Sequence, residues 1–364
     1  MPTIRQVIAA IEDFAPLTLQ ESYDNAGMQV GDASLTATGA LLCVDVTEAV
    51  VDEAIQLGVN LIIAHHPLLF RPLKRITGAN YIERVVMKAI KHDIAIYAAH
   101  TNLDAVAVNH MWAKRLGLGD VQVLQPTRDM LYKLVTYVPI SHVDAVKSTL
   151  FAAGAGTIGA YDCCSFTVAG EGTFRPGEGT NPYCGTHGLI HQEPESRVEV
   201  ILPRYLKSRV VRALLEQHPY EEPAYDLIPI ANDYTQAGMG IVGNLSQPIS
   251  AKDLLNRVKS DCGCGSIRHN ATNDNAMVQR VALCGGSGSS LIGAAVAAQA
   301  DIFITGEIGY HQFFGYENTL ILAEIGHFES EQHTKEIFCE VVTKKFPNFA
   351  TYYTNVDTNP IKYL

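Results

Sequence analysis

Short runs of apolar residues alternate with segments of helical periodicity in two stretches of the chain. Continuous apolar runs predict buried parallel strands, whereas apolar residues that recur every three or four positions predict amphipathic helices. Each stretch holds such strands with helices between them, so we predict an α/β fold in which two similar βαβ-type halves form one core domain. The predicted strands are 41–46, 60–64, 94–99, 281–284, 302–305 and 320–325, and the predicted helices are 47–57, 81–92, 291–298 and a short piece at 310–314.

The pattern changes between the two halves, from about residue 126 to residue 234. Strands and helices follow here in the order βαβ…βαβ, which is typical of a ferredoxin-like α+β domain. We therefore predict that residues 126–234 form an inserted domain and that residues 1–125 and 235–364 form one discontinuous core domain. Within the insert we predict strands at 131–138, 164–168, 197–202 and 225–229, helices at 142–153 and 207–218, and loops over the segment 170–188, which is rich in glycine and proline.

The N-terminal segment has the pattern of a capped amphipathic helix rather than of a secretion signal. Thr3 is the expected N-cap, and Gln6 completes a capping box. Polar residues interrupt the apolar positions, and no apolar run in the chain reaches the roughly 18 residues of a membrane helix. We therefore expect a cytoplasmic protein without a membrane partner.

Composition narrows the classes of function. The 364 residues are 47% apolar and 18% charged, which is ordinary for a globular protein. The net charge of −11 repels phosphate backbones, so nucleic acid is disfavoured as a partner. Eight cysteines without a Cys-x-x-Cys pair predict reduced thiols rather than a zinc ribbon or a disulfide framework.

Histidines and carboxylates gather at the ends of the predicted strands. His65 and His66 end one strand, Asp104 follows another by five residues, and His327 ends a third, with Glu331 four residues later. Parallel strands present their carboxyl ends at one edge of a sheet, where ligands collect in open α/β folds. His327 and Glu331 share a face if the chain turns helical after the preceding glycine. We therefore predict that these five residues bind metal.

The number of ligands indicates two ions. Five nitrogen and oxygen ligands exceed the need of one open site and suit two cations roughly 3.5–4 Å apart, bridged by a carboxylate and a water. A single histidine at a strand end is more often a capping or surface residue, so the hypothesis depends on the combination. The spacing leaves open which ligand binds which ion. We expect two divalent ions, with zinc first and iron or manganese as alternatives.

The segments that hold these residues resemble the Nif-three-like family, whose members are also named GTP cyclohydrolase I type 2. The likeness covers nearly the whole chain, and the insert is similar to the PII-like domain of the longer family members. The matching core segments are 23–27 (YDNAG), 64–67 (AHHP), 100–104 (HTNLD), 305–307 (TGE) and 326–331 (GHFESE), and those of the insert are 154–156 (GAG), 172–174 (GTF) and 218–223 (HPYEEP).

This resemblance implies a dinuclear metal centre whose ligands are His65, His66, Asp104, His327 and Glu331. It also implies a homohexamer in the form of a toroid.

Two ions at these ligands would lower the pKa of a bridging water and supply hydroxide at neutral pH. A hydroxide can open the imidazole ring of a purine nucleotide, and it can equally attack a phosphoester or an amide. Glu331 or Asp104 is the expected bridging carboxylate. Glu307 and His311 are candidates for ligand support or proton transfer, although Glu307 could equally be a first-turn carboxylate of a helix. We expect His100 to line the site.

Three further features have a simpler explanation than a binding site. The glycine-rich turn 285–290 lacks the lysine of a Walker motif, so it predicts a tight turn with a serine N-cap rather than a phosphate site. Segment 218–223 could bind a small effector but is more typical of a rigid turn. The scattered basic residues of the insert predict a solvated face.

These observations favour a hydrolase with a dinuclear metal centre that acts on a small, nucleotide-like molecule. The alternative is a metal-binding, metal-delivery or regulatory protein whose insert senses a ligand. A third hypothesis is a scaffold whose ions are structural. A catalytic centre keeps an open coordination position, and five ligands for two ions leave several, which favours the enzyme.

Overall fold

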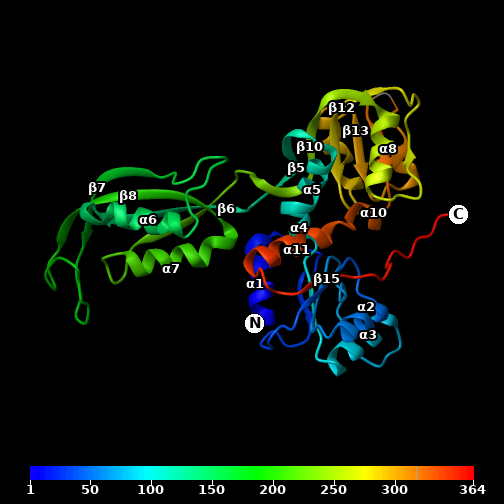
Figure 1. The fold of residues 1–364 in the computed structure, drawn as a ribbon. Coiled ribbons are helices and arrows are strands. Elements are labelled where there is room, and N and C mark those ends of the chain that lie inside the picture. Colours follow the sequence, from blue (N-terminus) through cyan, green and yellow to red (C-terminus); the bar gives the residue numbers. More distant parts are fainter. Residues whose placement is uncertain (318) are drawn as a thin grey trace. The chain divides into compact units, whose positions relative to one another are not determined.

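The computed structural model describes residues 1–317 and 319–364 (Figure 1). The chain divides into two compact units: a core unit, Met1–Gln125 with Ala237–Leu364, and an insert unit, Pro126–Gln236. Over the described residues the core unit holds two sheets and the insert unit holds one. The protein is therefore of the mixed α/β class, as the sequence predicts.

The first sheet of the core unit has three parallel strands at its centre, β4, β3 and β2. β1 pairs antiparallel with β4 at one edge, and β15 joins β2 in parallel at the other. Helices α2 (Glu48–Leu57) and α3 (Tyr81–Lys91) cover one face, while α1 (Ile4–Phe14) and α11 (Thr334–Lys345) pack on the other. The strand order is β1 (Gly27–Val30), β4 (Ala95–Ala98), β3 (Leu61–Ala64), β2 (Ala40–Cys43) and β15 (Thr351–Tyr353).

The second sheet of the core unit also has parallel strands at its centre, β12, β13 and β14. β10 and β11 pair with them antiparallel. Helix α9 (Ile292–Ala297) packs on one face, and α5 (Asn109–Leu116) and α8 (Ala251–Asp261) pack on the other. The strand order is β11 (Arg268–His269), β14 (Ile321–Glu324), β13 (Ile302–Thr305), β12 (Met277–Cys284), β10 (Tyr234–Ser250) and β5 (Gly119–Thr127).

One apolar cluster joins the inner faces of both sheets of the core unit. The central strands are buried on both faces, which is why they appear in the sequence as continuous apolar runs. The six predicted core strands are confirmed to within a few residues. β12 begins four residues before the predicted position because its first residues pair with the end of the long strand β10.

Helix α1 (Ile4–Phe14) begins as the sequence predicts. The backbone N–H of Gln6 donates to Thr3 Oγ1, and the backbone N–H of Thr3 donates to Gln6 Oε1, so the capping box is confirmed. Among the described residues the longest helix is α11 (Thr334–Lys345), with 12 residues. In that part of the chain no helix combines the length and apolar character needed to cross a membrane.

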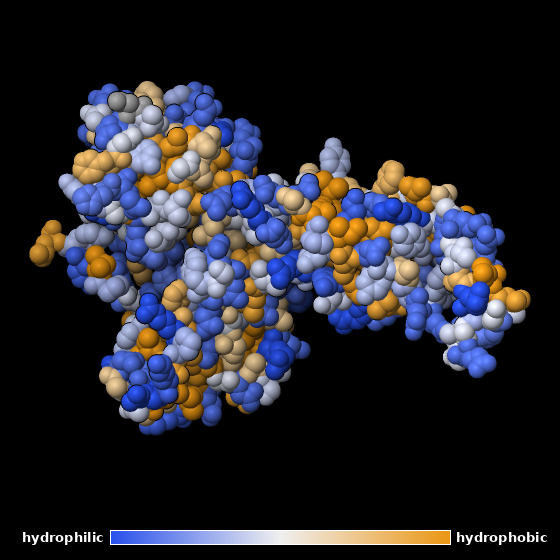
Figure 2. Space-filling view, turned by 180° about the vertical axis from the view of Figure 1, so that it is seen from behind, coloured by the Kyte–Doolittle hydropathy of each residue, from blue (hydrophilic) through white to orange (hydrophobic). Residues whose placement is uncertain are grey.

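The insert unit has the βαββαβ element order that the sequence predicts. Its strands pair antiparallel throughout, and α6 (Val143–Ala152) and α7 (Lys207–Gln217) form an apolar cluster against the sheet. Hydrophobic side chains of β7 and β9 stay exposed, among them Phe166, Val168 and Ile228, and Figure 2 shows apolar surface on this unit. The strand order is β7 (Phe166–Phe174), β8 (His191–Pro203), β6 (Leu131–Pro139) and β9 (Tyr225–Ile230).

The predicted loop 170–188 is wrong at its start. β7 continues through Gly170 and Gly172 and pairs along its whole length with β8, which begins at His191 instead of residue 197. Glycine has no side chain, so Gly170 and Gly172 hide the apolar–polar alternation by which a strand is recognised. A side chain at Gly172 would clash with the carboxylate of Glu195. A Cβ on Gly172 would lie 2.2 Å from Glu195 Oε2. The loop between the two strands is therefore 175–190.

The loop before α3 depends on the carboxylate of Glu83. Its oxygens accept hydrogen bonds from the backbone of Thr77 at 2.8 Å, the hydroxyl of Thr77 at 2.8 Å, the backbone of Ala79 at 3.0 Å and the side chain of Asn80 at 2.9 Å. These bonds, chiefly those from Thr77, lower the pKa of Glu83 to about 2.

We expect Glu83→Gln to lower the melting temperature at neutral pH and to have less effect as the pH falls. The folded-state pKa is depressed, so the stabilising contribution is present above the ordinary value of 4.5 and is lost as the pH falls toward about 2. Thermal denaturation from about pH 7 to about pH 3 measures the difference between the two proteins. Glu340→Gln, at an exposed position of α11, is the control, and a difference independent of pH would contradict the assignment.

Candidate metal centre

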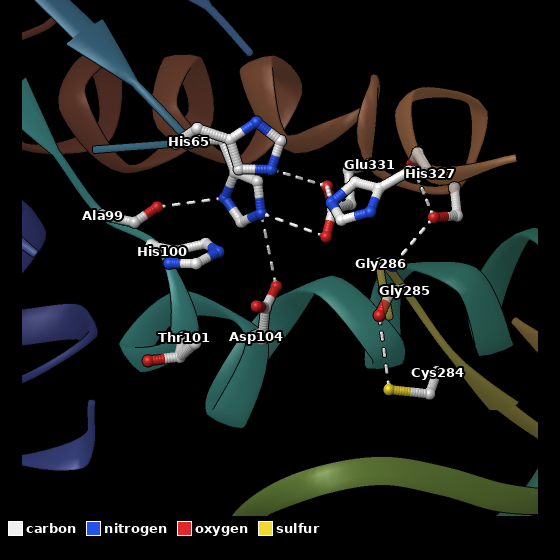
Figure 3. A network of polar contacts seen from close by, with 12 residues as sticks. His65, Ala99, His100, Thr101, Asp104, Cys284, Gly285, Gly286, His327 and Glu331 are labelled. Carbon is white, nitrogen blue, oxygen red and sulfur yellow. Dashed lines mark hydrogen bonds and ion pairs between the residues drawn. The ribbon is translucent and has the colours of Figure 1, made fainter. Parts of the chain in front are cut away.

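The five histidines and carboxylates predicted as ligands lie together in the core unit. Figure 3 labels four of them, His65, Asp104, His327 and Glu331. His65 and His66 follow β3, and Asp104 begins a short π-helix, Asp104–Val108, after β4. His327 and Glu331 are the first and last residues of the helix α10, which follows β14. The helix expected after Gly326 is therefore present, and the two sheets of the core unit both contribute to the cluster.

The carboxylate of Glu331 divides this cluster into two groups. Its Oε1 lies 3.5 Å from His65 Nε2, and its Oε2 lies 2.9 Å from His66 Nε2 and 3.2 Å from His327 Nε2. Asp104 Oδ1 lies 3.6 Å from His65 Nε2. One group is thus His65, Asp104 and Glu331, and the other is His66, His327 and Glu331. The adjacent histidines face different groups, a pairing that the sequence left open.

Two atoms of the cluster are buried without a hydrogen bond. His65 Nε2 and Asp104 Oδ1 have no hydrogen-bond partner among the described residues, although both atoms are inaccessible to solvent. An unpaired buried polar group costs about 1–3 kcal/mol, so such atoms require a partner. Their separation of 3.6 Å is too long for a hydrogen bond but suits two ligands of one ion. The residues therefore fit a bound cation.

The electrostatics of the cluster favour positive charge. Burial alone would lower the pKa of His66, but hydrogen bonds to Asp45 and Glu331 outweigh it and raise the pKa to about 10. Burial is likewise outweighed at His327, where Glu331 raises the pKa to about 9. Burial and the charge of Glu331 raise the pKa of Asp104 well above its usual range. Without a metal the cluster retains protons, and a cation can replace them.

Each histidine of the cluster is oriented through its Nδ1 atom. The outer hydrogen bond leaves Nε2 directed at Glu331, which is the arrangement typical of metal-binding histidines. The three outer bonds join His65 to the carbonyl oxygen of Ala99 at 3.0 Å, His66 to Asp45 Oδ1 at 2.8 Å and His327 to Glu307 Oε1 at 2.9 Å.

His100 lines the cluster, as we expected. Its ring lies 5.3 Å from the ring of His65 and 5.4 Å from that of His66, and its Nδ1 donates to Asp24 Oδ1 at 2.8 Å. His65, His66 and His100 also form a third group of donor atoms close enough to share an ion. His100 is therefore available as a further ligand or as a contact to a bound molecule.

The two residues proposed for support or proton transfer differ in position. Glu307 bonds to His327, and its side chain is 56% exposed, so it connects the cluster to solvent. His311 is exposed and packs against Tyr310 and Phe314, with ring centroids at 5.1 and 6.5 Å. Among the described residues, His311 has no hydrogen bond, ion pair or ring contact with a residue of the cluster. Its role stays a prediction.

The glycine-rich turn makes room for Glu331. The backbone N–H groups of Gly285, Gly286 and Gly288 donate to side chains of the core unit, so they are not free to hold a phosphate. Gly286 has φ +64°, and a Cβ there would lie 2.3 Å from Glu331 Oε1. The predicted serine N-cap is wrong, because the helical segment after the turn starts without a side-chain cap.

Of the groups that hold the ligands from outside, sequence reasoning gave a role to Glu307 but not to Asp45, Asp24 or Asn109. Asp45 lies two residues beyond the end of β2 and binds His66, so the strand-end argument could have found it. Asp24 was noted only as part of a motif, and it orients His100. Asn109 Oδ1 accepts the backbone N–H of Gly285 at 2.9 Å, a contact that no spacing in the sequence reveals.

Comparison with known proteins decides the family. A sequence model of Duf34/NIF3 (NGG1p interacting factor 3) matches residues 2–360. The chain belongs to the Duf34/NIF3 family. It is 42% identical over 308 residues to a protein of Halalkalibacterium halodurans named GTP cyclohydrolase 1 type 2 homolog, covering 84% of this chain and 82% of that one. A Bacillus subtilis protein of the same name is 35% identical over 371 residues, covering 99% of this chain and 98% of the relative.

Solved structures agree with this assignment. The Bacillus cereus protein related to NIF3 superposes with a TM-score of 0.87 at 36% identity, over 100% of this chain and 99% of that one. Staphylococcus aureus SA1388 gives a TM-score of 0.77 at 30% identity, with the same coverage. HcgD from Methanocaldococcus jannaschii, with a TM-score of 0.57 at 18% identity over 98% of each chain, shares the fold. The family resemblance predicted from the motifs is thus confirmed.

On the hypothesis that each group binds one ion, we expect Glu331→Gln to lose both ions and His327→Ala and Asp104→Asn to lose one each. Glu331 offers an oxygen to both groups, whereas His327 and Asp104 each belong to one. Elemental analysis of the purified full-length proteins measures metal per chain, with circular dichroism as the check on folding. His333→Gln, outside the cluster, should keep the wild-type content. Equal loss in all three variants would count against two separate groups.

We expect Gly286→Ala to reduce metal content as strongly as Glu331→Gln. A methyl group at this position would displace the Glu331 carboxylate from both groups, and the positive φ adds strain. Gly293→Ala in α9 is the matched control, because none of the described residues lies within 4 Å of a Cβ at that position. Normal metal content in Gly286→Ala would show that the carboxylate does not need this space.

Proposed function

We propose that the protein is a metal-dependent hydrolase with a dinuclear centre that acts on a small, nucleotide-like substrate. The observation that carries the proposal is the position of Glu331, whose two carboxylate oxygens face two different groups of ligands. A shared carboxylate is the usual bridge in two-ion hydrolytic centres. The relatives named GTP cyclohydrolase 1 type 2 homolog support the same class of reaction.

The ligand count supports catalysis over storage. With Glu331 shared, three protein ligands would hold each ion, which would leave coordination positions for water and substrate. Two ions bound there would supply an activated water and polarise the bond under attack. The burial of Glu331 and His65 excludes bulk water and strengthens every charge interaction at this position.

Glu307 is the proposed proton-transfer group. Its Oε1 accepts a hydrogen bond from His327 Nδ1, while more than half of its side chain faces solvent. A carboxylate in this position can hold the imidazole ring in place and exchange a proton with water. His311 is a second candidate for this role, on the grounds of its place in the sequence alone.

Aromatic residues near His100, and basic residues that follow one of them in the chain, support a nucleotide-like substrate. The rings of Tyr23 and Phe70 lie 6.5 Å apart, and the ring of Phe70 lies 6.3 Å from that of His100. Tyr23 is 61% exposed and Phe70 45% exposed, so both can stack on a base. The chain after Phe70 carries exposed cationic side chains suited to phosphate: Arg71, Lys74 and Arg75.

Three further expectations belong to this proposal. The zinc ions, the homohexamer and the PII-like character of the insert come from the family resemblance and from the donor set. Metal analysis of the purified protein and measurement of its mass in solution test the first two.

We expect the metal-loaded protein to turn over a member of a panel of purine nucleotides, phosphoesters and small amides. Glu307→Gln should lower kcat by about a hundredfold or more while keeping the wild-type metal content, because it removes a proton-transfer group and no ligand. Glu340→Gln is the matched control on an exposed helix position. Absence of turnover over the whole panel with both ions bound would overturn the hydrolase and favour metal delivery.

A further inference from the structure

A thiol, an imidazole and a carboxylate meet in the insert unit. Cys184 lies in the loop 175–190, and His191 and Glu193 lie at the start of β8. Alternate residues of a strand point to the same face, so the side chains of His191 and Glu193 lie together. The donor atoms of the three residues are all within 4.8 Å of one another, and His191 Nε2 is 2.8 Å from Glu193 Oε2.

We propose that Cys184, His191 and Glu193 form a cation site in the insert, distinct from the centre in the core unit. Sulfur, nitrogen and oxygen donors of this kind bind Zn²⁺ at roughly 2.0–2.3 Å, so ligands of one ion lie at most about 4.6 Å apart. The three donors converge to nearly this spacing. A thiolate in the set selects a thiophilic divalent ion over Mg²⁺ or Ca²⁺.

The surroundings hold the three donors in place. Gly185 has φ +89°, and a Cβ there would lie 3.0 Å from His191 Cβ, so a glycine is needed for the loop to approach β8 this closely. The ring of Phe174 packs 5.3 Å from that of His191 and 5.7 Å from that of Tyr220. Tyr220 in turn donates a hydrogen bond to Glu195 Oε1 at 2.7 Å. The site is therefore supported by a layer of packed side chains.

A simple ion pair explains less of this arrangement. The side chains of His191 and Glu193 are 29% and 23% exposed, and an ion pair with access to solvent contributes little to stability. Such a pair gives no reason for a thiol at the same point. A cation accounts for all three donors at once.

An ion at this site would order one wall of a cavity. The insert holds a cavity of about 650 Å³, large enough for a small organic ligand. Six of its lining residues belong to the loop that carries Cys184: Arg175, Pro176, Gly177, Thr180, Pro182 and Tyr183. A bond from Cys184 through the ion to β8 fixes this loop. Three protein ligands also leave one tetrahedral position open to water or to a bound molecule.

Titration of the metal-free full-length protein with Co²⁺ tests the proposal. A thiolate ligand produces a sulfur-to-cobalt charge-transfer band in the near ultraviolet, and the five residues of the core centre include no cysteine. We expect the band in the wild type and its loss in Cys184→Ser, with retention in Cys164→Ser, which lies in the same unit. His191→Gln should weaken Co²⁺ binding about tenfold or more, whereas His187→Gln in the same loop should leave it unchanged.

Two further measurements separate this site from the core centre and from misfolding. His327→Ala should keep the band, and Cys184→Ser should keep the far-ultraviolet circular dichroism of the wild type. Zn²⁺ should slow amide exchange in residues 176–190 of the wild type and not in Cys184→Ser. A wild type without the band, or a band that survives in Cys184→Ser, would overturn the proposal.

Discussion

The buried carboxylate of Glu331 is the group on which the core unit's chemistry depends. Its side chain is 2% exposed, and an unpaired charge at such depth costs several kcal/mol. Three imidazoles surround it, two on one oxygen and one on the other, and they hold its pKa well below the usual range despite burial. Three local features bring the imidazoles and this carboxylate together: the turn at Gly286, the helix α10 and the end of β3.

Asp104 explains why this arrangement calls for metal. His65 lies between two acids, 3.5 Å from Glu331 and 3.6 Å from Asp104, and burial lowers the pKa of its own ring. Burial and the charge of Glu331 outweigh the attraction of His66 and His327 and raise the pKa of Asp104, so Asp104 shifts toward its protonated form. A divalent cation beside His65 neutralises both acids and gives a partner to the two buried atoms that have none among the described residues. Protonation of Asp104 removes the repulsion between the two carboxylates but leaves the buried atoms without a partner in the described part of the chain.

The sequence predicts the position of the ligands better than their pairing. His65, His66 and His327 are recognisable because buried parallel strands appear as apolar runs whose ends meet at a sheet edge. Which carboxylate oxygen faces which histidine depends on side-chain rotamers, and these carry no trace in the sequence. The glycines of β7 hide its strand pattern in the same way. The spacing of the cysteines does not reveal the cluster at Cys184, because the other two donors of this cluster are a histidine and a glutamate.

The two candidate cation sites differ in donors and burial, and these differences assign them different tasks. The core cluster offers nitrogen and oxygen donors and encloses its shared carboxylate. This arrangement suits two metal ions that keep coordination positions open for reacting groups. The proposed insert site adds a sulfur donor and has partly exposed side chains on a loop, which suits an ion that holds backbone segments together. Loss of the insert ion would release one wall of a ligand-sized cavity but would leave every ligand of the core cluster in place. On the two proposals made above, the core centre and the insert site would therefore respond to different metals within one chain.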